Sequence, residues 1–178
     1  MDEVEFVIKL LSDNWSNAST IAAGKKDVKQ EDGSAWIYTP TPIFIDIRSL
    51  QPGKGKRVDL DDKPVIIVYE DSASLSHPTI DRAVRNEEYS FTLHLRVLHR
   101  RDYADLNYSR RLLQVLYQMA RHVLEKNGLR PKVYDDNDAL EASAELIQIT
   151  GRSEANDRGK KLLGYKMTVS MKRFGRTI

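Results

Sequence analysis

Apolar and polar positions repeat with two different periods along the chain, and each period predicts one kind of element. In residues 2–15 the apolar positions recur every three to four residues, as on one face of a helix. In residues 89–99 apolar and polar side chains alternate, which predicts a strand with one buried and one partly wet face. That alternation favours an antiparallel sheet, because a parallel sheet normally hides both of its faces.

The same two patterns predict the other elements. The run at 65–69 is β-branched on both faces and is therefore expected inside the sheet. The predicted fold class is α+β, an antiparallel or mixed β-sheet with helices on one face, in the order α-β-β-β-α-β-β. The remaining strands are expected at residues 43–47, 140–150 and 162–173, and the second helix at residues 102–127, ended by a left-handed Gly128.

Polar segments connect these elements. Residues 16–35 and 48–63 contain few large apolar side chains and are expected to be mobile loops, while residues 70–88 and 151–160 are expected to be irregular. With 178 residues the chain is expected to form a single domain. No apolar run is long enough for a membrane span, and the first residues lack the basic region of an export signal. We therefore expect an intracellular protein without a membrane partner.

The formal net charge of +2 conceals an uneven layout. Residues 134–157 contain seven acids and one base, whereas residues 158–178 contain seven bases and no acid. Segments of opposite charge either complement each other within one molecule or present an acidic and a basic surface to neighbouring copies. The sequence leaves both arrangements open.

No motif for catalysis or for a cofactor stands out. Cysteine is absent, and the four histidines lack the close helical spacing of zinc ligands, so they are interpreted as polar surface positions. Asp46, Glu70 and Asp71 suggest a metal-dependent nuclease, but no lysine follows the second acid closely. We expect no enzyme, no cofactor and no metal. A metal-dependent nuclease remains a lesser alternative. It would be favoured if the protein cleaved DNA in a metal-dependent manner and Asp46→Ala abolished that cleavage.

Basic residues on the second predicted helix suggest a nucleic-acid-binding accessory protein as the main alternative. Arg110 and Arg121 are eleven residues apart and therefore face the same way on a helix. Gln114, Gln118 and Glu125 interrupt this basic stripe, and no aromatic platform joins it. A solvated helix face is the better explanation of the stripe.

The element order resembles the tail terminator and tail completion proteins of tailed bacteriophages and related archaeal viruses. The resemblance rests on the Pro-led strand at 64–71, the strand at 89–99 and the amphipathic helix after Arg100-Arg101-Asp102. It implies a small α+β subunit that joins a homo-oligomeric ring, usually a hexamer, on the tail tube of the virion. It also implies assembly in the host cytoplasm, with the tail tube protein and the head completion or connector protein as partners. DNA in the lumen would be a further, non-specific contact.

Five residues are candidates for partner binding. Lys54, Lys56 and Arg57 form a basic tip in the predicted loop at 48–63, and reversing their charge is expected to impair head joining without unfolding the chain. Phe6 and Leu10 widen the apolar arc of the first helix beyond what one sheet needs. The alternative for these two is that a thick core takes the whole arc.

Overall fold

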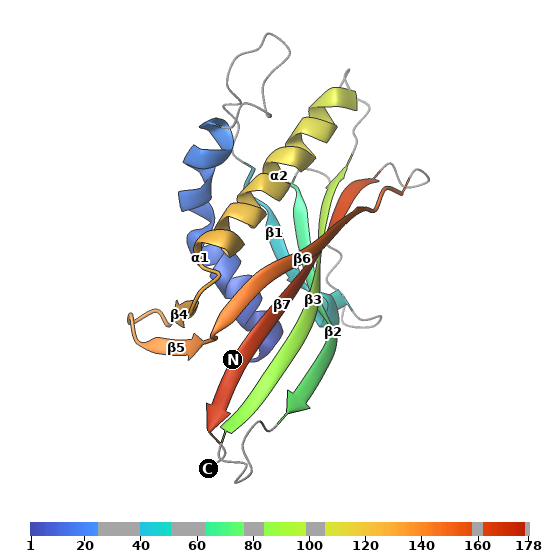
Figure 1. The fold of residues 1–178 in the computed structure, drawn as a ribbon. Helices are drawn as coiled ribbons and strands as arrows, with labels where there is room; N and C mark the ends of the chain where they lie inside the picture. Colours follow the sequence, from blue (N-terminus) through green and yellow to red (C-terminus); the bar gives the residue numbers. More distant parts are fainter. Residues whose placement is uncertain (25–39, 51–62, 77–83, 99–105, 158–161, 177–178) are drawn as a thin grey trace.

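The computed structural model describes residues 1–24, 40–50, 63–76, 84–98, 106–157 and 162–176, which form a mixed sheet with two helices (Figure 1). Strands β1, β2, β3, β7 and β6 lie side by side in that order, and β4 pairs with β5 in a separate hairpin. Only β1 and β2 run parallel. The expected fold class and the order α-β-β-β-α-β-β are confirmed. The elements are α1 (Glu3–Gly24), β1 (Ile43–Asp46), the 3-10 helix η1 (Ile47–Leu50), β2 (Val65–Ser76), β3 (Val84–Leu98), α2 (Leu106–Lys126), β4 (Lys132–Tyr134), β5 (Leu140–Ser143), β6 (Leu146–Glu154) and β7 (Leu162–Arg176).

Both helices cover the same face of the sheet and enclose the main core (Figure 1). Burying one large apolar side chain stabilises the fold by about 1.5–3 kcal/mol, so this layer is the main source of stability. A smaller cluster of Ile45, Val65 and Ile67 lies on the opposite face. The largest side chains buried in the main core include Phe6, Leu10, Phe91, Leu93, Leu95, Leu116, Met119 and Met167.

Helix α1 is longer than its apolar pattern predicts. The expected loop at 16–35 is wrong in its first part, because residues 16–24 continue the helix, and the remainder lies outside the described residues. Three alanines in this segment favour the helix even though few large apolar side chains are present. Before the extension, Trp15 fixes the helix to the sheet: its indole N–H donates to the Pro40 carbonyl at 2.8 Å, and its ring meets Phe44 edge-on.

Strands β2 and β3 also exceed their predicted lengths. Residues 70–76 and 84–88 were expected to be irregular. Instead, residues 70–76 pair with residues 86–91 of β3, ending at Ser76 and Asn86 and passing a bulge between Glu70 and Ser72, and residues 84–88 pair with β7. Backbone hydrogen bonds hold this extension, so it needs no alternating side-chain pattern. The loop expected at 48–63 is wrong at its start, where η1 continues to Leu50. Strand β2 lies between β1 and β3, which confirms its interior position.

The turn after α2 differs from the prediction. Gly128 is not left-handed; instead its carbonyl accepts the Ile147 N–H at 2.7 Å, and an added Cβ would lie 2.9 Å from the Ile147 oxygen. The close approach of the backbones at residues 128 and 147 therefore explains why position 128 is a glycine. The left-handed residue is Arg130, with φ of 49°. Neither helix in the described part of the chain is long and apolar enough to cross a bilayer.

The single strand expected at 140–150 is divided into β5 and β6. Between them the Ala144 N–H donates to the Pro131 carbonyl and the Glu145 N–H donates to the Lys172 carbonyl. The chain thus leaves one sheet and enters another without a polar loop, which is why no break shows in the sequence. Residues 151–154 continue β6, although the segment 151–160 was expected to be irregular.

Candidate interaction sites

The five predicted partner-binding residues do not form one site in the described structure. Phe6 and Leu10 are 0% and 1% exposed, so the chain's own core takes both side chains and leaves neither for a partner. This is the alternative that the sequence left open. Lys54, Lys56 and Arg57 lie outside the described residues.

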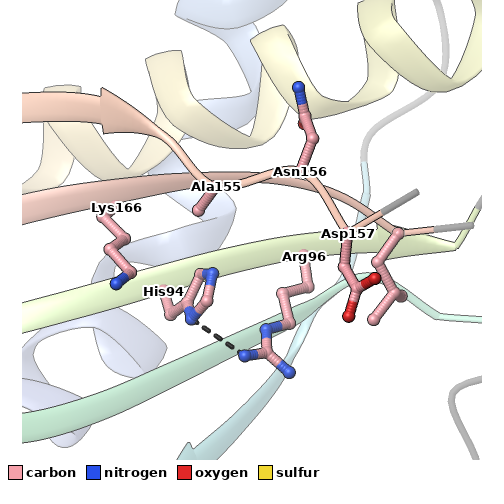
Figure 2. A pocket seen from close by; sticks show the side chains of 7 residues that line it. His94, Arg96, Ala155, Asn156, Asp157 and Lys166 are labelled. Carbon is pink, nitrogen blue, oxygen red and sulfur yellow. Dashed lines mark hydrogen bonds between the residues drawn. The ribbon is translucent and has the colours of Figure 1, made fainter. Parts of the chain in front are cut away.

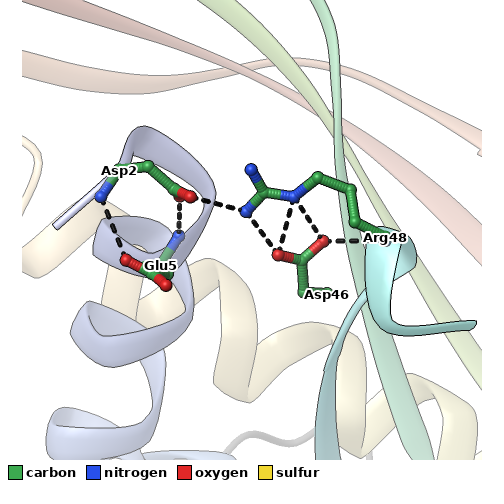
Figure 3. A network of polar contacts seen from close by, with 4 residues as sticks. All are labelled: Asp2, Glu5, Asp46 and Arg48. Atoms are coloured by element: carbon green, nitrogen blue, oxygen red, sulfur yellow. Dashed lines mark hydrogen bonds and ion pairs between the residues drawn. The ribbon is translucent and has the colours of Figure 1, made fainter. Parts of the chain in front are cut away.

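Asp46, the first acid of the nuclease alternative, is engaged in an ion pair (Figure 3). The Arg48 Nε donates to both Asp46 carboxylate oxygens at 2.9 and 2.8 Å, and a second guanidinium nitrogen reaches Asp2 at 2.7 Å. Asp71, in turn, accepts the Thr92 hydroxyl at 2.6 Å. Within the described ranges no three His, Asp or Glu side chains could share a metal ion. The Asp46 network fastens β1 to the start of α1.

The charges of this network reinforce one another. The Asp46 and Asp2 carboxylates raise the pKa of the Arg48 guanidinium. Partial burial acts to raise the pKa of the Asp2 carboxyl, but the backbone N–H groups of Glu5 and Val4 and the Arg48 guanidinium together lower it. Asp2 and Glu5 also exchange hydrogen bonds, since each backbone N–H donates to the other carboxylate, at 3.1 and 2.9 Å. This is a capping box that starts α1.

The basic stripe on α2 is only partly available. Arg121 donates to Glu125 at 2.5 Å, one helical turn away, which neutralises it locally. Arg110 is exposed at the other end of the helix. The basic residues that precede the helix, Arg100 and Arg101, lie outside the described residues.

A more concentrated group of cations lines a pocket on the sheet face that the helices do not cover (Figure 2). The pocket has a volume of about 290 Å³. His94 and Arg96 reach it from β3, and Lys166 reaches it from the register position on β7 opposite His94. The residues that line this cationic pocket are His94, Arg96, Ala155, Asn156, Asp157, Leu162 and Lys166.

His94 is not the surface position that the sequence suggested, because it is only 8% exposed. An Arg96 guanidinium N–H donates to its Nδ1 at 3.0 Å. A guanidinium only donates, so Nδ1 carries no proton and the neutral ring is protonated at Nε2. An added Cβ on Gly164 would meet Nε2 only at 3.5 Å, an ordinary contact, but it would lie 2.9 and 3.0 Å from the Leu95 and Ala155 carbonyl oxygens, so the close approach of backbones explains this glycine.

The electrostatics of the cationic pocket favour an anion. Burial, followed by the positive charges of Arg96 and Lys166, lowers the pKa of His94 to about 4, so the ring is neutral at physiological pH. The buried Nε2 completes no hydrogen bond among the described residues. The nearby Ala155 carbonyl acts to raise the pKa of His94, against the larger effects of burial and of the two cations. Neither Arg96 nor Lys166 pairs with a carboxylate in the described part of the chain. Asp157 is the one acid in the lining.

No protein-family model matches the chain, and no curated protein matches its sequence. The sequence did hold one signal for the cationic pocket: His94 and Arg96 lie two apart on the polar face of a predicted strand. That Lys166 lies beside these two residues follows only from the register of β3 against β7.

The structure also bears on the uneven charge layout. Two bases of β7 pair with acids outside β6: Lys172 contacts Glu88 on β3 at 2.6 Å, and Arg173 contacts Glu3 on α1 at 2.9 Å. Lys166 has no ion pair among the described residues. Among the described residues, these three bases therefore do not neutralise the acidic segment across the β6–β7 pair.

Proposed function

We propose that this chain is a structural subunit of a virion neck that assembles with copies of itself into a ring, as tail terminator proteins do. The ring would cap the tail tube and join it to the head connector. The observation that carries the proposal is the order and layering of the elements, because the resemblance to that family rests on them. Such a subunit requires no covalent chemistry, only surfaces that fit its neighbours.

The sheet offers surfaces of this kind beyond the core. The ends of β2, β3 and β7 run past the helices at the bottom of Figure 1. Leu75 and Phe174 on these projecting strands are 57% and 58% exposed. In the described part, β1 pairs with β2 only as far as Val68, so residues 69–76 have an open outer edge. Open edges and exposed apolar side chains are features through which strands contact a neighbour.

Nucleic-acid binding is the competing proposal, and the two cations of the cationic pocket favour it. Arg96 and Lys166 would suit a backbone phosphate. Binding of that kind loses affinity steeply as salt rises, because condensed counterions are released from the phosphates. Filter binding of duplex and single-stranded DNA over a salt series tests it.

The ring is tested by native mass spectrometry of the purified full chain over a wide concentration range, followed by negative-stain electron microscopy. We expect a single discrete multimer, with a hexamer as the leading stoichiometry, and particles with a central opening. Open filaments or a ladder of sizes would contradict a closed ring. A chain that remains monomeric at every concentration would contradict self-assembly and shift weight to nucleic-acid binding.

A further inference from the structure

The β4–β5 hairpin carries a group of acids with no ion-pair partner within the described residues. Asp135 shapes its turn by accepting the N–H groups of Asn137 and Ala139, both at 2.8 Å. Asp136, Asp138 and Glu141 are exposed around that turn and take part in none of the ion pairs. We call residues 132–143 the acidic hairpin.

Exposed apolar side chains flank these acids. Tyr134 and Leu140 are opposite each other in the β4–β5 register and are 45% and 55% exposed. Leu129, just before the hairpin, is 79% exposed. Exposed aromatic and apolar side chains are features of protein contact surfaces, and charged side chains at the rim of such a surface add specificity. The acidic hairpin is therefore suited to docking against a protein.

The acidic hairpin and the cationic pocket lie too far apart to meet within one molecule. The hairpin precedes the start of β6, and the pocket lies at its far end, beside residues 155–157 (Figure 1). Strand β6 has 9 residues, and at about 3.3 Å per residue it spans roughly 30 Å. The two also occupy opposite faces, because Val133 of the hairpin packs into the core under the helices, whereas His94 points away from that core.

We propose that the acidic hairpin of one copy docks into the cationic pocket of the next copy, with its carboxylates bound by Arg96 and Lys166. This inference rests on the proposed ring, for which it names the subunit contact. A guanidinium and an ammonium both form charge-assisted hydrogen bonds to carboxylates, and Arg96 can do so in a bidentate manner. Because the two surfaces differ, the contact is heterologous, and repeating it yields a ring if the rotation closes.

Two charge variants test the contact from its two sides. Lys166→Glu reverses the exposed cation of the pocket, and Asp136→Lys with Glu141→Lys reverses the hairpin while leaving the left-handed Asp138 untouched. Each variant is expected to raise the concentration at which half of the chain is assembled by at least about tenfold, measured by light scattering after size exclusion. Circular dichroism should show that both variants remain folded.

A matched control removes charge without touching the contact. Asp136→Asn and Glu141→Gln together remove two charges from the hairpin. Neutralising two exposed acids on the helices changes the net charge equally, and this control is expected to assemble like the wild type. Its substitutions are Asp13→Asn and Glu125→Gln.

Mixing the two reversed variants gives the sharpest test. Neither variant can form the contact with itself, but the intact hairpin of one fits the intact pocket of the other. An equimolar mixture should therefore restore a native junction and form complexes at concentrations where each variant alone stays monomeric. Variants that assemble like the wild type would overturn the inference and leave the ring standing.

The remaining outcomes separate the two proposals. If the wild type forms filaments that both variants abolish, the contact holds and the closed ring fails. If the wild type stays monomeric, the contact is refuted. If Lys166→Glu leaves assembly unchanged and instead abolishes binding of duplex DNA, the pocket takes phosphate and the inference is also refuted.

Discussion

At the scale of single residues, buried polar groups on the open face of the sheet have consequences for stability. His94 lies within a cationic neighbourhood that includes Arg96 and Lys166, and Asp157 also lines the pocket. Burial, followed by the charges of these two cations, lowers the pKa of His94 and keeps its ring neutral at physiological pH. Gly164 lies close to this ring. A larger residue there would be strained, since an added Cβ would lie 2.9 Å from the Leu95 carbonyl oxygen.

The His94 arrangement predicts a loss of stability in mild acid. The pKa of His94 is about 4 in the folded chain against 6.5 for an ordinary histidine. Between these values the unfolded chain binds a proton that the folded chain does not, so the contribution is complete above pH 6.5 and lost as the pH falls toward 4. We expect the free energy of unfolding to drop by on the order of 1–3 kcal/mol over this window.

Urea unfolding at a series of pH values measures this drop. His94→Gln, which cannot titrate, should flatten the profile in this window. Lys166→Met, which removes one of the two cations, should raise the pKa of His94 in the folded chain and therefore make the loss smaller, with its lower end at a higher pH. A His94→Gln profile that matches the wild type would show that this histidine does not determine the acid response.

At the scale of elements, the start of α1 depends on Asp2. Its carboxylate accepts the Glu5 N–H within the capping box and also pairs with Arg48 of η1, just after β1. The same side chain thus begins a helix and fastens it to the sheet. The sequence places an acid at this position, but the link to Arg48 joins residues 46 positions apart.

Asp2→Ala is expected to lower the free energy of unfolding by about 1–2 kcal/mol at neutral pH, chiefly through the lost N-cap. Because the pKa of the Asp2 carboxyl is lowered in the folded chain, this contribution is present above its ordinary value of 3.8 and lost below it. Asp13→Ala is the control, because it removes an exposed helical acid whose partners, Lys9 and the Ser12 hydroxyl, lie within α1. Equal losses for the two variants in urea unfolding would refute the capping role.

At the scale of the whole molecule, opposite charges are separated in space. The cationic pocket and the acidic hairpin lie at opposite ends of β6, and the cations of β7 that do pair reach Glu88 and Glu3. A molecule with this polarity is suited to head-to-tail contacts. Two-fold dimers, in contrast, join identical patches.

Assembly through such contacts should weaken as salt rises. The Debye length falls from about 10 Å at 0.1 M to about 3 Å at 1 M ionic strength, so exposed charge pairs lose most of their attraction. We expect the multimer fraction, followed by analytical ultracentrifugation, to fall across this range while the fold persists. Multimers that strengthen with salt would instead indicate that apolar side chains such as Tyr134 and Leu140 dominate the contact.

Much of the fold could be predicted because local patterns report burial. The alternation at 89–97 and 163–171 marks strands with one face in the core, and the apolar stripe of α2 marks the face that packs on them. Where no face is buried, as at residues 70–76, the pattern vanishes although the strand continues. Pairing with a neighbouring strand then decides the structure, and a single sequence does not reveal that neighbour.

By itself, the sequence determined the fold class, the order of the main elements and the unequal distribution of charge, since each follows from side chains close together in the chain. Only the tertiary structure decided that Phe6 and Leu10 belong to the core. It also brought Lys166 opposite His94 and set the acidic hairpin at the other end of β6 from the cationic pocket. These results depend on strand register and on packing between distant segments, where the energy of each contact is shared by residues that no local pattern connects.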